Sequence, residues 1–243
     1  MIGEPIIELR GVEKALGDAF PLRINAFTLR ARERVVLAGL PGLMGEALMN
    51  LIIGASLPEH GDVIVFGTNT KDIRTDTEWL TSLDRFGLVS NRAVLLEQST
   101  IAQNLALPLT LAIDPMAPDV RAKVEALARE VQLRADQLDQ PPASVGASAL
   151  AATSRTDIHL ARALAHDPDV LLLEHPTVSH GGGGTFGAKL RSVADRRGLS
   201  FIAVSDDDRF ARDSGATRLR VDREGAVRSS GFSLRRLMGV SGW

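Results

Sequence analysis

The fold of this chain is constrained most strongly by short, continuously apolar runs that alternate with segments of helical period. Residues 170–173 and 201–204 contain no polar side chain, which is typical of strands buried on both faces of a parallel sheet. Four further runs predict strands at residues 6–9, 34–38, 63–66 and 86–89. Alternation of such strands with helices predicts an α/β fold with a mainly parallel sheet flanked by helices.

The spacing of apolar residues that is typical of an α-helix is clearest in two segments. Apolar residues recur there at spacings of three and four: Val120, Val124, Leu127 and Val131, and Phe186, Leu190 and Val193. Between residues 99 and 164 the patterns are helical and interrupted by prolines, with no convincing strand. This favours a helical sub-domain at 99–164, inserted into an α/β core of residues 1–98 and 165–243. The run of four glycines at 181–184 is expected to form a mobile loop.

Composition excludes several functions. The 243 residues carry 28 Lys and Arg against 30 Asp and Glu, so no basic surface is expected to hold nucleic acid. The chain has no Cys, which excludes disulfides and thiolate metal sites, and its five His have no metal-ligand spacing. We therefore expect no metal site. No signal sequence and no apolar run of about 20 residues is found, which favours a cytoplasmic protein.

The order of the segments resembles the nucleotide-binding domain of ABC transporters, the ATP-binding cassette. The stretches that carry the resemblance include ARERVVLAGLPG, HLARALAHDPDVLLLEHPT and LRSVADRRGLSFIAVSDD. The resemblance covers nearly the whole chain. It implies one P-loop NTPase-like domain over residues 1–243, with an antiparallel β portion at its N-terminus.

The phosphate-binding loop departs from the family's motif, G-x-x-x-x-G-K-[ST]. Gly39 and Gly42 keep their motif positions. Met44 replaces the second motif Gly, Gly45 replaces the Lys, and Glu46, followed by Ala47, replaces the Ser or Thr. The Cβ of Met44 would obstruct close approach of the backbone to a phosphate, and Glu46 would place a carboxylate beside it. We expect no resident cofactor here, and at most weak binding of ATP and Mg²⁺.

The other family motifs are altered in the same way. Glu174 and His175 stand where relatives carry the Asp that holds Mg²⁺ and the Glu that polarises the attacking water. Asn91 occupies the Q-loop position and Asp206 the H-loop position, while Leu16 replaces the aromatic residue that stacks on adenine. These residues are the positional equivalents of the family's catalytic residues, and none of them is assigned a catalytic role.

The signature segment aligns with residues that lack the family's two glycines: Ala151, Ala152, Thr153 and Ser154. Thr153 or Ser154 could donate to an anion, but a plain N-cap of a helix beginning near residue 156 is the better interpretation.

The resemblance therefore implies a cassette-like subunit of an ABC-type membrane transport system that has lost hydrolysis, a pseudo-ATPase. Its expected partners are a membrane-embedded transporter subunit and a second cassette, which would hold it peripherally on the inner face of the cell membrane. Residues 99–111 are the candidate docking region, through Leu105, Leu107 and Leu109, although these leucines could equally belong to the core. Two alternatives stay open: an atypical active ATPase using Glu174, His175 and Arg155, and a soluble adaptor without a transporter.

Overall fold

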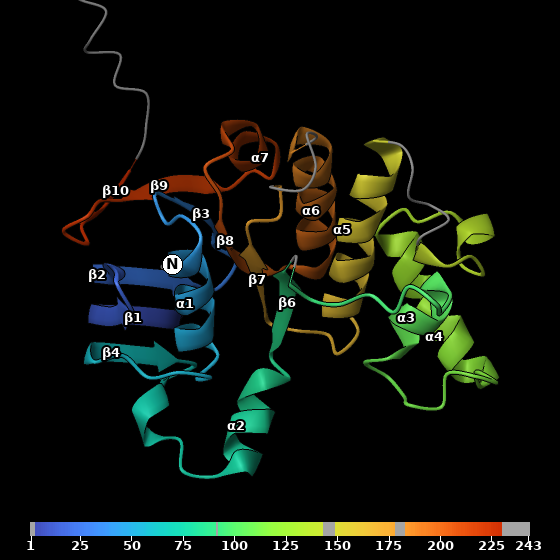
Figure 1. Ribbon diagram of the computed structural model, residues 1–243, viewed down its shortest axis with the longest axis horizontal. Coiled ribbons are helices and arrows are strands. Elements are labelled where there is room, and N and C mark those ends of the chain that lie inside the picture. The colour runs from blue at the N-terminus through green and yellow to red at the C-terminus, as the bar shows by residue number, and fades with distance from the viewer. Residues whose placement is uncertain (1–2, 91, 143–148, 178–182, 230–243) are drawn as a thin grey trace, which may run out of the picture.

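The larger of two sheets forms the centre of the molecule (Figure 1). The computed structural model describes residues 3–90, 92–142, 149–177 and 183–229. The sheet has the strand order β10-β9-β3-β8-β7-β6. Its strands are β3 (Arg34–Ala38), β6 (Phe86–Ser90), β7 (Val170–Glu174), β8 (Ser200–Val204), β9 (Thr217–Val221) and β10 (Val227–Ser229). Only the pairing of β10 with β9 is antiparallel among these described strands, so the predicted parallel α/β core is confirmed.

A smaller antiparallel sheet lies on one side of the core and has the order β2-β1-β4-β5. Its strands are β1 (Pro5–Leu16), β2 (Ala19–Arg30), β4 (His60–Val65) and β5 (Thr68–Asn69). The predicted N-terminal antiparallel portion is thereby confirmed. Strand β2 had no prediction from the sequence, because its buried residues change from even positions, Leu22 and Ile24, to odd positions, Phe27 and Leu29. The change breaks the simple alternation that identifies a half-buried strand.

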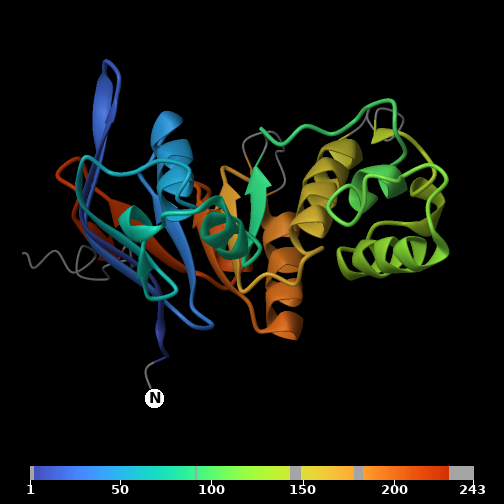
Figure 2. The same ribbon diagram turned by 90° about the horizontal axis from the view of Figure 1, so that it is seen from below.

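Seven α-helices are described. Their bounds are α1 (Leu43–Ile52), α2 (Asp76–Leu83), α3 (Ile101–Ala106), α4 (Pro118–Glu130), α5 (Ala149–Ala163), α6 (Gly183–Arg197) and α7 (Asp208–Asp213). Figure 2 shows helices α3 and α4 and the N-terminal sheet at opposite ends of the molecule, with α5 and α6 between them. The described residues between β6 and β7 form helices and one isolated bridge. None of the described helices is long and apolar enough to cross a membrane.

Alternating side chains of the central strands divide the core between the two faces of the sheet. In β7, Leu171 and Leu173 pack with helices α3 to α6, whereas Val170 and Leu172 pack with α1 and the N-terminal sheet. All four side chains are fully buried. Because both faces are covered, the strand consists of apolar residues alone until it reaches Glu174, where the chain leaves the core.

Two local expectations are wrong, and one open alternative is decided. Gly183 and Gly184 form the first turn of α6 rather than a loop, and residues 181 and 182 lie outside the described chain. Thr153 and Ser154 lie inside α5, which begins at Ala149, so neither is an N-cap. Leu105, for which a docking surface and the core were both open, is fully buried against α4 and α5 and belongs to the core.

Leu107 and Leu109 follow α3 and are half-buried, and Leu109 packs against the same core cluster as Leu105. Every residue of α3 except Gln103 is buried, so this short helix offers no exposed apolar face. Exposed apolar residues lie on either side of the helix instead, at Val94 and Leu111.

Candidate functional site

The carboxyl ends of the central parallel strands converge where open α/β sheets commonly place their sites. The loop after β3 leads into α1, and Glu174 ends β7. Ser90 ends β6 directly opposite Glu174 in the parallel register, and Asp206 follows β8. The topology therefore brings together the residues that the family resemblance assigned to the nucleotide site.

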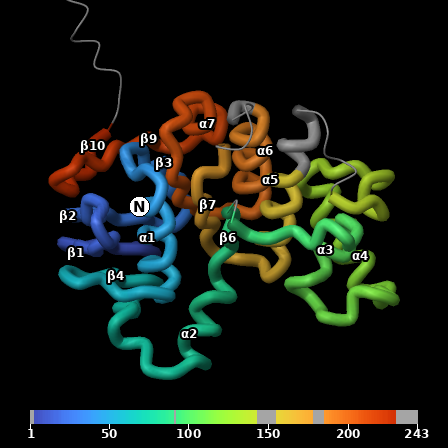
Figure 3. Tube along the Cα trace, in the orientation of Figure 1, coloured from blue at the N-terminus to red at the C-terminus, as the bar shows by residue number. Residues whose placement is uncertain are grey.

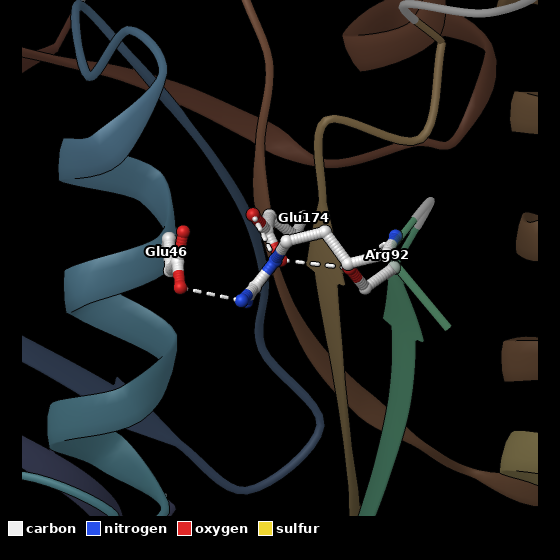
Figure 4. A network of polar contacts seen from close by, with 4 residues as sticks. Glu46, Arg92 and Glu174 are labelled. Atoms are coloured by element: carbon white, nitrogen blue, oxygen red, sulfur yellow. Dashed lines mark hydrogen bonds and ion pairs between the residues drawn. The ribbon is translucent and has the colours of Figure 1, made fainter. Parts of the chain in front are cut away.

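Arg92 lies at the centre of this convergence and bridges two carboxylates (Figure 4). Its Nη1 donates to Oε1 of Glu46 on α1 at 2.5 Å. Its Nη2 donates to Oε2 of Glu174 at 2.8 Å, and its Nε lies 3.1 and 3.0 Å from the two oxygens of the same carboxylate. One planar guanidinium thus joins the phosphate-loop helix to the end of β7, and its forked donors engage both oxygens of Glu174.

Glu174 is the buried member of this cluster. Its side chain is 8% exposed, whereas that of Arg92 is 47% exposed. Ser90 Oγ also donates to Oε2 of Glu174 at 2.8 Å, and the amide of Arg92 donates to Ser90 Oγ at 3.1 Å. The hydrogen bonds to Glu174 raise the pKa of Arg92 above its ordinary value. Arg92 therefore stays charged, and the buried carboxylate is compensated by groups of the chain itself.

Backbone amides of the phosphate loop are also engaged internally. The amide of Gly39 donates to Oδ1 of Asp206 at 2.9 Å. The amides of Met44 and Gly45 donate to the carbonyls of Pro41 and Gly42 at 3.1 and 3.2 Å. A loop that binds phosphate needs such amides directed at the ligand. Here three of them are directed at a carboxylate or at carbonyls of the loop.

Gly45 lies against His175, so the structure places the steric conflict here rather than at Met44. An ideal Cβ on Gly45 would lie 2.7 Å from His175 Nε2 and 3.2 Å from Val204 Cγ1. His175 adopts a positive φ of 42°, and its amide donates to the carbonyl of Val204 at 3.0 Å. The side chain of Met44, by contrast, packs against the apolar core next to α1. The ring of His175 thus takes the space that a side chain at position 45 would need.

A pocket of about 810 Å³ borders the other side of the loop. The start of β2, the phosphate loop, Asp206, strand β9 and the turn after β9 contribute its walls. Leu16, the residue expected to take the place of the stacking aromatic, is half-buried and packs against the core, and it does not line this pocket. Phe20 lines it instead and is 68% exposed, with the guanidinium of Arg223 5.3 Å from its ring centroid.

Several of the remaining sequence candidates are not brought into contact with this cluster. Asn91 lies outside the described residues. Ala151, Ala152, Thr153 and Ser154 belong to the backbone of α5, Ala47 is buried within α1, and Arg155 forms an ion pair with Glu97. No group of three or more His, Asp or Glu side chains suited to a metal ion occurs within the ranges that the structure describes.

Sequence reasoning missed Arg92 and Ser90. A signal was available, because the family alignment placed two carboxylates, Glu46 and Glu174, on adjacent elements with no Lys nearby. Carboxylates brought together at a buried strand end require a counter-charge. The nearest cation in the aligned motifs is Arg92, directly after the Q-loop position, but only the fold shows that its side chain reaches both carboxylates.

Comparison with known proteins places this fold in a family. A sequence profile described as "ABC transporter" matches residues 22–178. A lipoprotein-releasing system ATP-binding protein, LolD of Anaeromyxobacter dehalogenans, is 30% identical over 217 residues, which are 86% of this chain and 88% of that protein. The macrolide export ATP-binding/permease protein MacB of Haemophilus ducreyi is 27% identical over 210 residues, or 84% of this chain. The match spans only 29% of that longer protein.

Solved structures show the same architecture. The dimeric structure of MJ0796, a bacterial ABC transporter cassette, superposes with a TM-score of 0.71 at 22% identity, covering 93% of this chain and 100% of that one. The cbiO1 protein of Clostridium perfringens, part of the ABC transporter complex cbiONQ, gives a TM-score of 0.72 at 15% identity, covering 92% and 87% of the two chains. Together with the profile match, this fold shows that the chain belongs to the ABC transporter family.

Proposed function

We propose that this chain is the cassette subunit of an ABC-type membrane transport system and that it acts without hydrolysing ATP. The observation that carries the proposal is the bridge from Arg92 to Glu46 and Glu174. These two positions correspond to the residues that hold Mg²⁺ in working relatives, and both are engaged by one guanidinium of the chain. In this proposal residues 1–98 and 165–243 form the core, and residues 99–164 form the helical sub-domain.

The residues present do not fit the phosphates of ATP with Mg²⁺. Position 45 offers no cation, and the ring of His175 fills the space that a lysine there would need. The amides of Gly39, Met44 and Gly45 are already hydrogen-bonded within the protein. Phosphoryl transfer relies on positioning and on neutralising phosphate charge, so a site without these groups has little means of lowering the barrier.

The role that remains is structural or regulatory, through docking. Val94 and Leu111, on either side of α3, are 73% and 92% exposed, and Leu96 is 42% exposed. Exposed apolar residues that gather in a patch mark interaction sites, and in this proposal these residues contribute to the docking surface. A membrane-embedded subunit is the expected partner, since relatives such as MacB combine an ATP-binding part and a permease by name. A second cassette is the other expected partner, since the cassette MJ0796 is a dimer.

Measured turnover distinguishes the proposed pseudo-ATPase from an atypical active enzyme. The purified chain, alone and with any co-purifying membrane subunit, is incubated with radiolabelled ATP and Mg²⁺. We expect phosphate release at background, unchanged by Glu174→Gln. Turnover that Glu174→Gln abolishes would show that the enzyme is active and that the proposal is wrong.

Co-purification tests the transporter assignment. The tagged chain is extracted from membranes of its own host in mild detergent, with Leu111→Asp and Val94→Asp as surface variants. We expect a membrane-embedded subunit to co-purify with the wild-type chain and to be reduced or lost with the variants. Recovery of the chain without any membrane subunit would favour a soluble adaptor instead.

A further inference from the structure

We propose that Arg92 is a resident cation that fills a two-carboxylate site and ties the segment after β6 to the core without a metal ion. We define this segment, residues 92–100, as the strap, because it crosses from β6 to α3 (Figure 3). The proposal concerns cation dependence and the mobility of the strap. It goes beyond the loss of hydrolysis and does not rest on it.

Charge balance is the first step. Glu46 and Glu174 come from different elements and converge on the same guanidinium, at 2.5 and 2.8 Å. Glu174 is 8% exposed, so its charge is largely removed from water and needs a partner. Without Arg92, two carboxylates and the hydroxyl of Ser90 would face a space that had lost its cation. Carboxylate and hydroxyl oxygens are ligands that divalent hard cations accept.

Attachment of the strap is the second step. From Val94 onward the strap is held to the helices: the carbonyl of Val94 accepts a hydrogen bond from Arg162 Nη1 at 2.9 Å, and Glu97 forms an ion pair with Arg155. Leu95 is 4% exposed within the apolar core, and the side chain of Asn104 on α3 bonds to both the amide and the carbonyl of Leu96. At its first residue, the side chain of Arg92 joins the strap to α1 and to β7. The Arg92 side chain therefore fixes the first residues of the strap to α1 and to the end of β7.

The test uses thermal unfolding of the full chain with MgCl₂ or with NaCl of equal ionic strength. The wild-type melting temperature should change by less than about 1 °C between the two salts. Arg92→Ala leaves a buried carboxylate uncompensated and should melt about 10 °C lower in NaCl. Mg²⁺ at about ten times its dissociation constant should then raise the melting temperature of the variant by about 3–6 °C.

Two controls separate this effect from general destabilisation. Arg92→Ala combined with Glu174→Gln should lose the specific response to Mg²⁺, because one of the two carboxylates is gone. Arg85→Ala removes an exposed ion pair with Asp169 before β6 and should show no response. Arg92→Met, which keeps the aliphatic stem, is measured in parallel with Arg92→Ala.

Hydrogen exchange measures the local opening of the strap directly. The amides of residues 92 and 93, which bond to Ser90, should exchange at least fivefold faster in Arg92→Ala than in the wild-type chain in NaCl, and Mg²⁺ should slow them again. The proposal is wrong if Mg²⁺ stabilises the wild-type chain as much as the variant, or if neither Arg92→Ala nor Arg92→Met recovers with Mg²⁺. Unchanged exchange of the strap would refute its attachment through Arg92. Neither the melting temperatures nor the exchange rates depend on ATP turnover. Failure of the proposed function would therefore be detected in the phosphate-release assay and not in these measurements.

Discussion

Adding a single methyl group at Gly45 should show whether the ring of His175 occupies the space that the motif lysine would need at position 45. In Gly45→Ala, the new Cβ would lie 2.7 Å from His175 Nε2 and 3.2 Å from Val204 Cγ1. The first distance is shorter than any ordinary contact, so the ring of His175 must move. Gly45→Lys places the same Cβ there and adds a longer chain, so it would meet the same obstacle first.

Two opposing terms set the magnitude. Overpacking at a buried site costs about 1–3 kcal/mol of unfolding free energy. Replacing Gly by Ala within a helix gains up to about 1 kcal/mol. The expected net loss for Gly45→Ala is therefore about 1–2 kcal/mol. In the background of His175→Ala only the 3.2 Å contact with Val204 remains, and the same substitution should be neutral or slightly stabilising.

A double-mutant cycle measured by urea denaturation gives the coupling energy between the two positions. We expect a coupling of about 1–3 kcal/mol, well above the 0.3–0.5 kcal/mol scatter of roughly additive sites. Equal effects of Gly45→Ala in both backgrounds would show that the ring of His175 does not close this position. If the coupling is found, Gly45→Lys with Glu46→Ser should restore little ATP binding until His175→Ala is added.

Two further predictions concern stability. Burial raises the pKa of Asp157 to about 6 although Lys189 pairs with it, so the folded state holds a proton that the unfolded state releases near pH 3.9. The free energy of unfolding of the wild-type chain, relative to Asp157→Asn, should therefore fall by about 2 kcal/mol as the pH rises from 4 to 7 in urea titrations, and parallel pH profiles would contradict this. Leu105→Ala should lower the free energy of unfolding by about 2–5 kcal/mol because Leu105 is fully buried, whereas Leu111→Ala, at a site 92% exposed, should change it by less than about 0.5 kcal/mol. A larger loss of unfolding free energy for Leu111→Ala than for Leu105→Ala would show that Leu105 is not buried.

Much of the fold follows from the sequence because buried parallel strands carry an unmistakable pattern. The apolar runs at residues 170–173 and 201–204 became β7 and β8, each fully buried. Strand β2 was missed because its buried side chains change phase between Ile24 and Phe27. The leucines at positions 105, 107 and 109, in and after α3, were assigned to two alternatives, surface or core, because sequence spacing alone does not show which neighbours cover a short helix.

The site was predictable in its positions but not in its contacts. Alignment with the family located Glu46, Glu174 and Asp206, and the fold brings all three to the carboxyl ends of the strands. The bridge of Arg92 depends on how a side chain after β6 reaches across to α1, which involves residues 46 positions apart. The contact between Gly45 and His175 likewise joins distant segments, so no local pattern reveals it.

Calorimetric titration of the wild-type chain with ATP and Mg²⁺ tests most directly whether the site is filled by the protein's own groups. Because Arg92, Asp206 and the loop carbonyls already engage the groups that would hold phosphate, we expect a dissociation constant weaker than about 1 mM, that is, a binding free energy less favourable than about −4 kcal/mol. A micromolar or tighter constant would show that the loop opens for nucleotide and would contradict the proposed loss of the ATP site.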